Sequence, residues 1–185
     1  MMHIIIVMIF IAFASKVTAL ENCDILGSLE ADPLKKTVPV KFEDLQYLKL
    51  IDACTEAIEI QDHNIGRYYL LRARGYLRSG SYEKAISDIK HSHDLGYAAA
   101  TFAFATLHHF GEAMPKDLTR AEFLYKLAYN SGVKWAAQGL SILYKDISFS
   151  RYDLKLSHEW LEKFLNDKLS VRIKTNRERP GLGKL

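Results

Sequence analysis

The chain has 185 residues, a formal net charge of +3 and 49% hydrophobic residues, which fit a single globular domain with a real core. The charge is unevenly placed, because residues 168–185 carry six basic residues and one acidic residue. Residues 20–167 carry a net charge of −3, so the composition excludes a basic nucleic-acid-binding surface on the body of the protein.

The N-terminus has the features of an export signal. Residues 4–14 form an unbroken apolar run of eleven residues, whereas a membrane-spanning helix needs about 20. The run has the length of a signal-peptide core, and the small residues at 17–19 predict cleavage between Ala19 and Leu20. A weaker alternative site lies at 12–14, and an uncleaved anchor is the other interpretation, since no Lys or Arg precedes the run. We expect an exported protein, periplasmic or secreted, with no stable membrane insertion after cleavage.

The chain has two cysteines, Cys23 and Cys54. In an exported protein an even number of cysteines favours a disulfide. The bond would close a loop of about 30 residues and, by loop entropy, stabilise the fold by roughly 3–4 kcal/mol. The alternative is a pair of buried thiols that pack as small apolar side chains.

The segment after the signal is expected to be irregular as far as residue 40, because Pro33 and Pro39 disfavour helix at the residue before each of them. Residues 41–61 are predicted to form a helix, followed by a turn at 62–64. The apolar side chains at helical spacing in this helix include Leu45, Leu48, Ile51 and Ala53.

Residues 66–96 are predicted to form helix, turn and helix, with the turn at Ser79-Gly80-Ser81. The side chains expected to face other helices are Tyr69, Ala73 and Tyr76 in the first helix and Tyr82, Ala85, Ile86, Ile89 and Ser92 in the second. No alternating pattern of apolar and polar residues indicates a strand.

The sequence then matches itself at an offset of 36 residues. The matching residues are Leu107 and Leu143, Asp117 and Asp153, Leu118 and Leu154, the helix-ending Gly96 and Gly132, and the small residues Ala85, Ala121 and Ser157. A pair of short helices cannot bury its apolar face alone, so such pairs stack around a continuous core. We expect the small residues where paired helices cross closely.

The second repeated unit carries a recognisable set of motifs. They are Phe-Ala-Thr-Leu-His at 104–108, Gly-Glu-Ala-Met-Pro-Lys-Asp at 111–117, Leu-Tyr-Lys at 124–126, and Ala121, Ala128 and Gly132. This unit resembles a Sel1-like repeat, a longer-looped relative of the tetratricopeptide repeat. It departs from that pattern where Ala105 and Ala113 replace glycines and His108 replaces a tyrosine.

The neighbouring units resemble the same families. The third unit keeps Leu140, Tyr144, Asp153 and Trp160 but has lost its loop glycines, and residues 66–96 look more like an ordinary tetratricopeptide repeat. The opening around Cys23 and Pro33 is similar to the lead-in of exported bacterial repeat proteins. The resemblance implies an all-α fold, a short α-solenoid of stacked helix-turn-helix repeats that acts in protein–protein interaction and needs no cofactor.

The predicted division of the chain follows from these patterns. It comprises a signal peptide (1–19), a lead-in and capping helix (20–65), a repeat domain (66–167, in units 66–96, 97–132 and 133–167) and a basic tail (168–185). The tail is polar and basic, and we expect a disordered, solvated end. The alternative is contact between the tail and an anionic surface or partner.

Catalytic and metal-binding patterns are weak. The histidine pairs 91/93 and 108/109 point to different faces of a helix. His158 is followed four residues later by Glu162, where a zinc-binding protease helix has a second histidine. Cys54 cannot be a nucleophile if it is in a disulfide. We expect no metal, no cofactor and no enzymatic activity.

Six aromatic residues occupy repeat positions, and we interpret them as core residues rather than as a ligand-binding surface. They are Tyr69, Tyr76, Tyr82, Tyr125, Tyr144 and Trp160.

A binding surface is predicted on the first repeat. Arg67, Arg74 and Arg78 share one helix face, because their offsets of seven and eleven residues are close to whole turns. The resemblance implies that this face is concave, with His109 extending it in the next unit. Arginine forks bind carboxylates well, so an acidic segment or a C-terminal carboxylate of another protein is the expected ligand. The alternative is a solvated cationic face, and the asparagine of clamp-type repeats is missing.

The sequence therefore predicts an exported, non-enzymatic interaction module, an adaptor or scaffold that binds another protein or peptide. Two alternatives remain: a structural envelope protein that self-associates, and a hydrolase whose site leaves no local motif.

Overall fold

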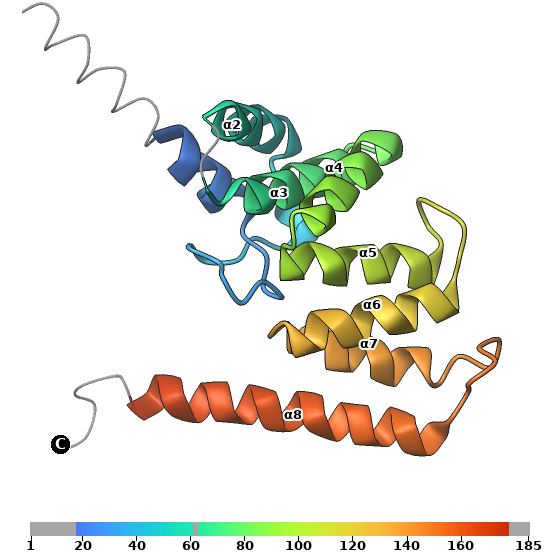
Figure 1. The fold of residues 1–185 in the computed structure, drawn as a ribbon. Helices are drawn as coiled ribbons and strands as arrows, with labels where there is room; N and C mark the ends of the chain where they lie inside the picture. The colour runs from blue at the N-terminus through green and yellow to red at the C-terminus, as the bar shows by residue number, and fades with distance from the viewer. Residues whose placement is uncertain (1–17, 61–62, 178–185) are drawn as a thin grey trace, which may run out of the picture.

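The computed structural model describes residues 18–60 and 63–177, so most of the predicted signal peptide lies outside the described part. All regular structure in the described part is helical. Figure 1 shows the helices as successive layers from α2 at one end to α8 at the other. After helical residues 18–27, the elements are η1 (Phe42–Asp44), α2 (Tyr47–Glu59), α3 (Ile65–Arg78), α4 (Tyr82–Asp94), α5 (Ala98–Phe110), α6 (Leu118–Asn130), α7 (Trp135–Leu143) and α8 (Leu154–Arg177). Among these described helices, none has the length and apolar character needed to cross a membrane.

The repeat geometry confirms the predicted all-α solenoid. Helices α3–α4, α5–α6 and α7–α8 form pairs, and the second helix of one pair packs on the first helix of the next. Ala85, Ala121 and Ser157 are fully buried, as expected for close crossings. Gly139 of α7 lies against the ring of Tyr125, since a Cβ on this glycine would come within 2.6 Å of Tyr125 Cε1. The stacked pairs share one continuous core.

The offset of 36 residues corresponds to equivalent backbone hydrogen bonds in the second and third units. The amide of Asp117 donates to the carbonyl of His108 at 2.8 Å, and the amide of Asp153 donates to that of Tyr144 at 3.0 Å. Each aspartate also caps the helix that follows, since its side chain accepts a bond from a first-turn amide. The matching aspartates therefore start matching helices.

A second, smaller core lies at the N-terminal end. Cys23 and Cys54 form a disulfide with 4.7 Å between their Cα atoms, which confirms the predicted bond. It joins the helical residues 18–27 to α2, and both cysteines are fully buried beside Leu50 and Tyr68. The disulfide thus ties the start of the chain to the first layer of the solenoid.

Several predicted core positions are wrong. In α2 the buried face is Leu50, Cys54 and Ala57, whereas Leu48 is 66% exposed. The disulfide orients this helix, and apolar spacing alone could not choose between its two faces. Tyr82 is exposed because it begins α4 at the rim of the turn. Of the other five predicted core aromatics, Tyr125 and Tyr144 are buried, and Tyr69, Tyr76 and Trp160 are half-buried.

The prediction of a disordered tail is wrong for residues 168–177, which continue α8. Gly96 and Gly132 end α4 and α6 with φ angles of 80° and 95°. The residue 36 positions after Gly132 is Lys168, which gives the third unit no left-handed stop signal. The helix therefore runs past the point at which the earlier units close.

Candidate functional site

The inner face of α3, which carries Arg67 and Arg74, is covered by the lead-in, here residues 18–46. Arg67 is 4% exposed. Its Nε lies 2.8 Å from Asp24 Oδ1, and its Nη2 donates to Asp24 Oδ2 at 2.9 Å. This fork-shaped ion pair engages both oxygens of a carboxylate from the same chain.

The side chain of Arg74 is bound by backbone carbonyls instead of a carboxylate. Its guanidinium donates to the backbone carbonyls of Gly27, Ser28 (2.8 Å) and Val40 (2.9 Å), all in the lead-in. Burial lowers the pKa of Arg74 to about 10, so the side chain remains a cation at neutral pH. Three carbonyl dipoles, rather than a carboxylate, therefore solvate this charge.

The predicted open arginine stripe is contradicted by this burial. Arg78 is exposed in the last turn of α3, but Arg67 and Arg74 are not available to a partner. His109 is 2% exposed, and its Nδ1 lies 3.2 Å from the Tyr125 hydroxyl. The residue spacing placed Arg67 and Arg74 on one face of α3 but gave no sign that the lead-in covers this face.

An open groove lies between the lead-in and the last unit. Figure 1 shows the loops of the lead-in and the C-terminal part of α8 along the same edge of the molecule. It is lined by lead-in residues between 30 and 35, by the start of α7 and by residues 164–169 of α8, and its volume is about 710 Å³. We call it the lead-in groove. The groove is lined by elements that are about 130 residues apart in the sequence, so no local sequence motif predicts it.

Aromatic rings form the wall of the lead-in groove on the side of the last unit. The ring centroids of Trp135 and Phe164 are 5.2 Å apart. The Nζ of Lys168 lies 4.7 Å from the centroid of the first ring and 4.9 Å from that of the second. Leu165 and Leu169 are 54% and 56% exposed at the same wall. The wall therefore combines an apolar surface with a lysine at its edge.

Two of the three carboxylates that line the groove, those of Asp32 and Asp167, hold its walls in place. Asp32 accepts hydrogen bonds from the Tyr97 hydroxyl at 2.5 Å and from the amide of Leu34 at 2.9 Å. Burial and the bond to Asp32 raise the pKa of the Tyr97 hydroxyl. Asp167 accepts from the Tyr129 hydroxyl at 3.1 Å and lies 3.6 Å from Lys134 Nζ. Both carboxylates are engaged in structural contacts and do not form a paired acid–base site.

A second cleft, of about 620 Å³, lies between the loops of the second and third units. Its lining includes His108, Asp117 and Ser148, and it is a shallower, more polar surface than the lead-in groove. The neighbouring ion pair between Lys116 Nζ and Asp146 Oδ2, at 2.7 Å, links the two loops. Among the described residues, no group of three His, Cys, Asp or Glu side chains is placed to hold a metal ion. The lead-in groove is therefore the stronger candidate.

Sequence reasoning missed the residues that matter most here. Asp24 and Val40 were not recognised as partners of the arginines, and Trp135 and Phe164 were not singled out at all. Of the residues on this wall of the groove, only Lys168 and Leu169 lay in a segment that the sequence analysis had described, the basic tail. The predicted cleavage site, Ala19 and Leu20, lies in helical residues 18–27, and cleavage there remains a prediction.

No protein-family model matches the sequence, and no curated protein matches it. The fold is similar to the crystal structure of a Sel1 repeat protein from Oxalobacter formigenes, with 22% sequence identity and a TM-score of 0.53. The match covers 64% of this chain and 48% of that protein, so the chain spans about half of its length. The likeness concerns the fold alone, and it confirms the predicted Sel1-like repeat solenoid.

Proposed function

We propose that this protein is an exported, non-enzymatic interaction module that binds a segment of another protein in the lead-in groove. The observation that carries the proposal is the open wall of Trp135, Leu165 and Leu169, which is backed by the buried ring of Phe164 and edged by Lys168. Aromatic side chains bury a large area at low entropic cost, and they are enriched at the centres of protein interfaces. The inner face of α3 does not compete for this role, because the lead-in covers it.

The chemistry of the groove indicates the kind of segment that it binds. Apolar or aromatic side chains of the partner would pack on Trp135, Leu165 and Leu169. An acidic side chain beside them would meet Lys168 and Lys35, which lie at the two sides of the groove and are both exposed. The expected ligand is therefore an apolar segment with a neighbouring acidic residue, and salt should weaken its binding.

Export is supported by the apolar N-terminal run and by the disulfide, because disulfides persist in oxidising compartments. We place the protein in the periplasm or outside the cell. A non-enzymatic role is supported by two carboxylates of the groove, Asp32 and Asp167, which are held by Tyr97, Tyr129 and Lys134 rather than aimed at a substrate.

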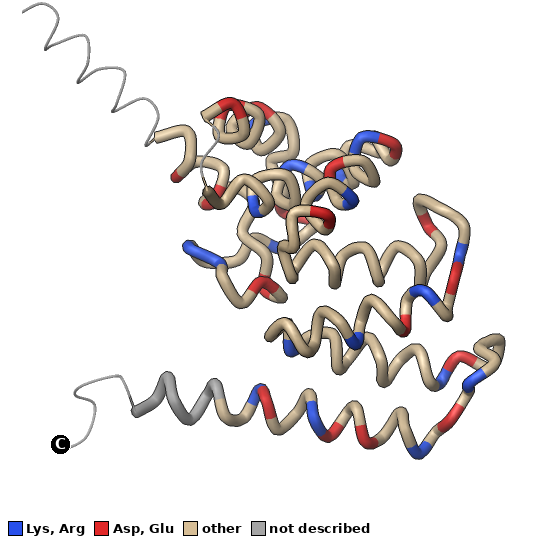
Figure 2. Tube along the Cα trace, viewed as in Figure 1, with Lys and Arg blue, Asp and Glu red and all other residues tan. Residues whose placement is uncertain are grey.

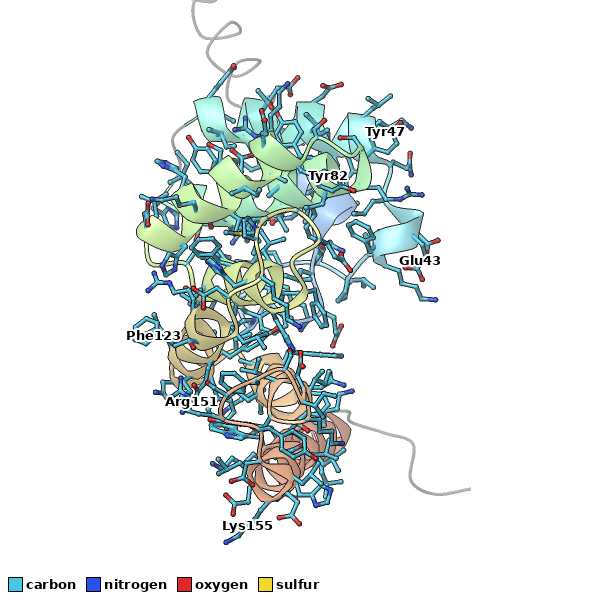
Figure 3. All side chains as sticks on the ribbon, turned by 90° about the vertical axis from the view of Figure 1, so that its right-hand side faces the viewer. Glu43, Tyr47, Tyr82, Phe123, Arg151 and Lys155 are labelled. Carbon is cyan, nitrogen blue, oxygen red and sulfur yellow. A yellow bond between two sulfur atoms is a disulfide. The ribbon has the colours of Figure 1, made fainter. Side chains whose placement is uncertain are left out.

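Site-specific photocrosslinking in the exporting cell tests the proposal. A benzoylphenylalanine at Trp135 should capture a defined partner, identified by mass spectrometry, and the purified partner should then bind the purified protein. The matched control is Phe123, labelled in Figure 3, an aromatic side chain that is 57% exposed on α6 and does not line the groove. Equal capture of the same partner at both positions, or capture at Phe123 alone, would place the binding surface elsewhere.

A further inference from the structure

One side of α7 remains accessible along the whole helix. Trp135, Gln138 and Ile142 lie on this side, because offsets of three and seven residues are close to whole helical turns. Ile142 is 46% exposed, and the other two are half-buried, whereas the remaining six residues of the helix are buried. We call these three residues the α7 strip. It begins in the lead-in groove, which Trp135 lines, and runs to the opposite end of the helix.

A second, smaller pocket lies at that opposite end, and none of the residues that line it lines the lead-in groove. Its volume is about 320 Å³. We call it the α7 end pocket, and its lining residues are His109, Phe110, Lys116, Ile142, Lys145 and Asp146. Phe110 is 51% exposed, and its ring stacks on that of the buried His109 with 4.3 Å between the centroids. The stacking holds Phe110 in place, so the pocket offers a preformed apolar surface.

The α7 end pocket has the same chemistry as the lead-in groove, an apolar surface with lysine at its edge. Figure 2 shows no charged residue along α7 itself, and Lys145 follows the end of the helix by two residues. The Nζ of Lys116 is already paired with Asp146 Oδ2 at 2.7 Å. Lys145 is exposed and forms no ion pair with another described residue. An acidic side chain next to an apolar one would therefore meet Lys145 here, as it would meet Lys168 in the groove.

The length of the α7 strip determines the spacing of the side chains that bind at its two ends. Trp135 and Ile142 are two helical turns apart, a rise of about 10 Å. A polyproline II segment advances about 3.1 Å per residue and presents every third side chain on the same face, so positions i and i+3 span about 9 Å. Such a segment leaves its peptide groups unpaired, and the amide of Gln138, between the two ends, can both donate to them and accept from them. A helical ligand pairs its own peptide groups, so the strip favours an extended one.

We propose that the partner segment bound in the lead-in groove continues along the α7 strip in an extended conformation. Its second apolar side chain, three residues from the first, occupies the α7 end pocket, and an acidic neighbour meets Lys145. This inference rests on the proposed function, to which it adds the conformation of the ligand and the spacing of its two apolar residues. Because one segment fills both sites, the second contact strengthens the first without the cost of a second association.

Photocrosslinking from three positions in the exporting cell tests the inference separately from the proposed function. Benzoylphenylalanine is placed at Trp135, at Ile142 or at Ile147. Ile147 is the matched control, because it is 88% exposed and lines neither site. Trp135 and Ile142 should capture the same protein, and mass spectrometry of the crosslinked peptides should place the two attachment points about three residues apart in it.

The outcomes separate the two claims. Capture at Trp135 without capture of the same protein at Ile142 would overturn the inference and leave the proposed function intact. Attachment points about seven residues apart would indicate a helical ligand and would also overturn it. Equal capture of that protein at Ile147 would remove the specificity that the α7 end pocket requires. Capture at neither Trp135 nor Ile142, or at Ile142 alone, would overturn both claims.

A synthetic peptide with the sequence of the captured segment then measures the contribution of the second site. In isothermal titration calorimetry, Ile142→Gln and Lys145→Glu should each weaken binding about fivefold, and Ile147→Gln should change it less than about twofold. A shorter peptide without the second apolar residue should bind wild type and Ile142→Gln equally. Equal affinity of the longer peptide for wild type and Ile142→Gln would overturn the inference. An equal loss for both peptides would overturn it as well, because the substitution would then act on the lead-in groove and not on a second site.

Discussion

The first and last units of the solenoid are both pairs of helices, but the first unit has its inner face covered, whereas the last unit borders an open groove. The inner face of α3 buries Arg67 and Arg74 under the lead-in, which supplies one carboxylate and three carbonyls to them. The last unit leaves Trp135 and two leucines of α8 beside an open groove. A repeat position therefore does not determine whether its face is a binding surface; the segments that precede and follow the repeats decide that.

The N-terminal end of the solenoid, which the lead-in closes, is held by specific polar and covalent contacts. The stacked units beyond this closed end are held by a continuous apolar core, in which small residues allow the helices to cross closely. Removal of a single contact should therefore cost most at the closed end.

The largest expected effect is that of Asp24→Ala. The change leaves the Arg67 guanidinium buried without its carboxylate, which typically costs about 3–5 kcal/mol of unfolding free energy. Urea unfolding monitored by circular dichroism measures the loss. Asp94→Ala is the control, because Asp94 forms an exposed ion pair with Lys90 on α4 and its loss should leave the midpoint nearly unchanged. Similar midpoints for the two variants would show that the buried pair does not hold the lead-in.

Loss of the disulfide should have the second-largest effect on stability. The double change Cys23→Ser and Cys54→Ser removes a cross-link between residues 31 positions apart, which loop entropy values at about 3–4 kcal/mol. The lead-in should also become sensitive to protease earlier than α5–α8, because the bond ties it to α2. Thermal unfolding with and without reductant measures the first effect, and timed proteolysis with mass spectrometry measures the second. Uniform proteolysis along the chain would mean that the disulfide does not specifically stabilise the lead-in and α2.

Overpacking of the stacked units should cost less. Ala121→Leu forces three extra carbon atoms into a fully buried crossing, at a cost of about 1–3 kcal/mol, and Ala85→Leu should behave alike at the equivalent position. Phe123→Leu, two residues further along α6 and exposed, is the matched control. An unchanged melting temperature for either core variant would show that the units are not stacked through these small residues.

The smallest expected effect is a dependence of stability on pH that arises from His109 in the stacked units. Burial, with a contribution from Lys116, lowers the pKa of His109, so the unfolded chain binds a proton more readily than the folded protein. Stability should therefore fall as the pH drops below about 6.5, the ordinary histidine pKa. His109→Gln should flatten this decline, while His158→Gln, at an exposed position of α8, should not. Parallel pH profiles for wild type and His109→Gln would contradict the assignment.

The sequence was sufficient for those parts of the fold that repeat. The offset of 36 residues located Ala85, Ala121 and Ser157 at the crossings, because close helix packing admits only small side chains there. Two cysteines in an exported chain were enough to predict the disulfide. These features depend on local spacing or on a count, and both can be read from one sequence.

The site could not be predicted in the same way, because it depends on contacts between distant segments. The arginine spacing correctly placed Arg67 and Arg74 on one face, but their partners lie 34 to 47 residues away in a segment without periodicity. Trp135 belongs to the groove only because α8 continues past Lys168 beside the lead-in. Neither arrangement leaves a pattern in the local sequence.

The central claim is that the last unit, and not the first, is the binding end. The most direct test measures how tightly the partner captured at Trp135 binds two variants. Trp135→Ala removes an aromatic side chain from the open groove and should weaken binding by about 30-fold, equivalent to about 2 kcal/mol. Arg78→Glu reverses the one exposed charge of the predicted arginine stripe and should change the affinity less than about twofold, since the lead-in covers the rest of that face. Isothermal titration calorimetry of both variants against the purified partner gives the answer. The opposite ranking, with Arg78→Glu abolishing binding and Trp135→Ala leaving it intact, would show that the first unit, not the last, is the binding end.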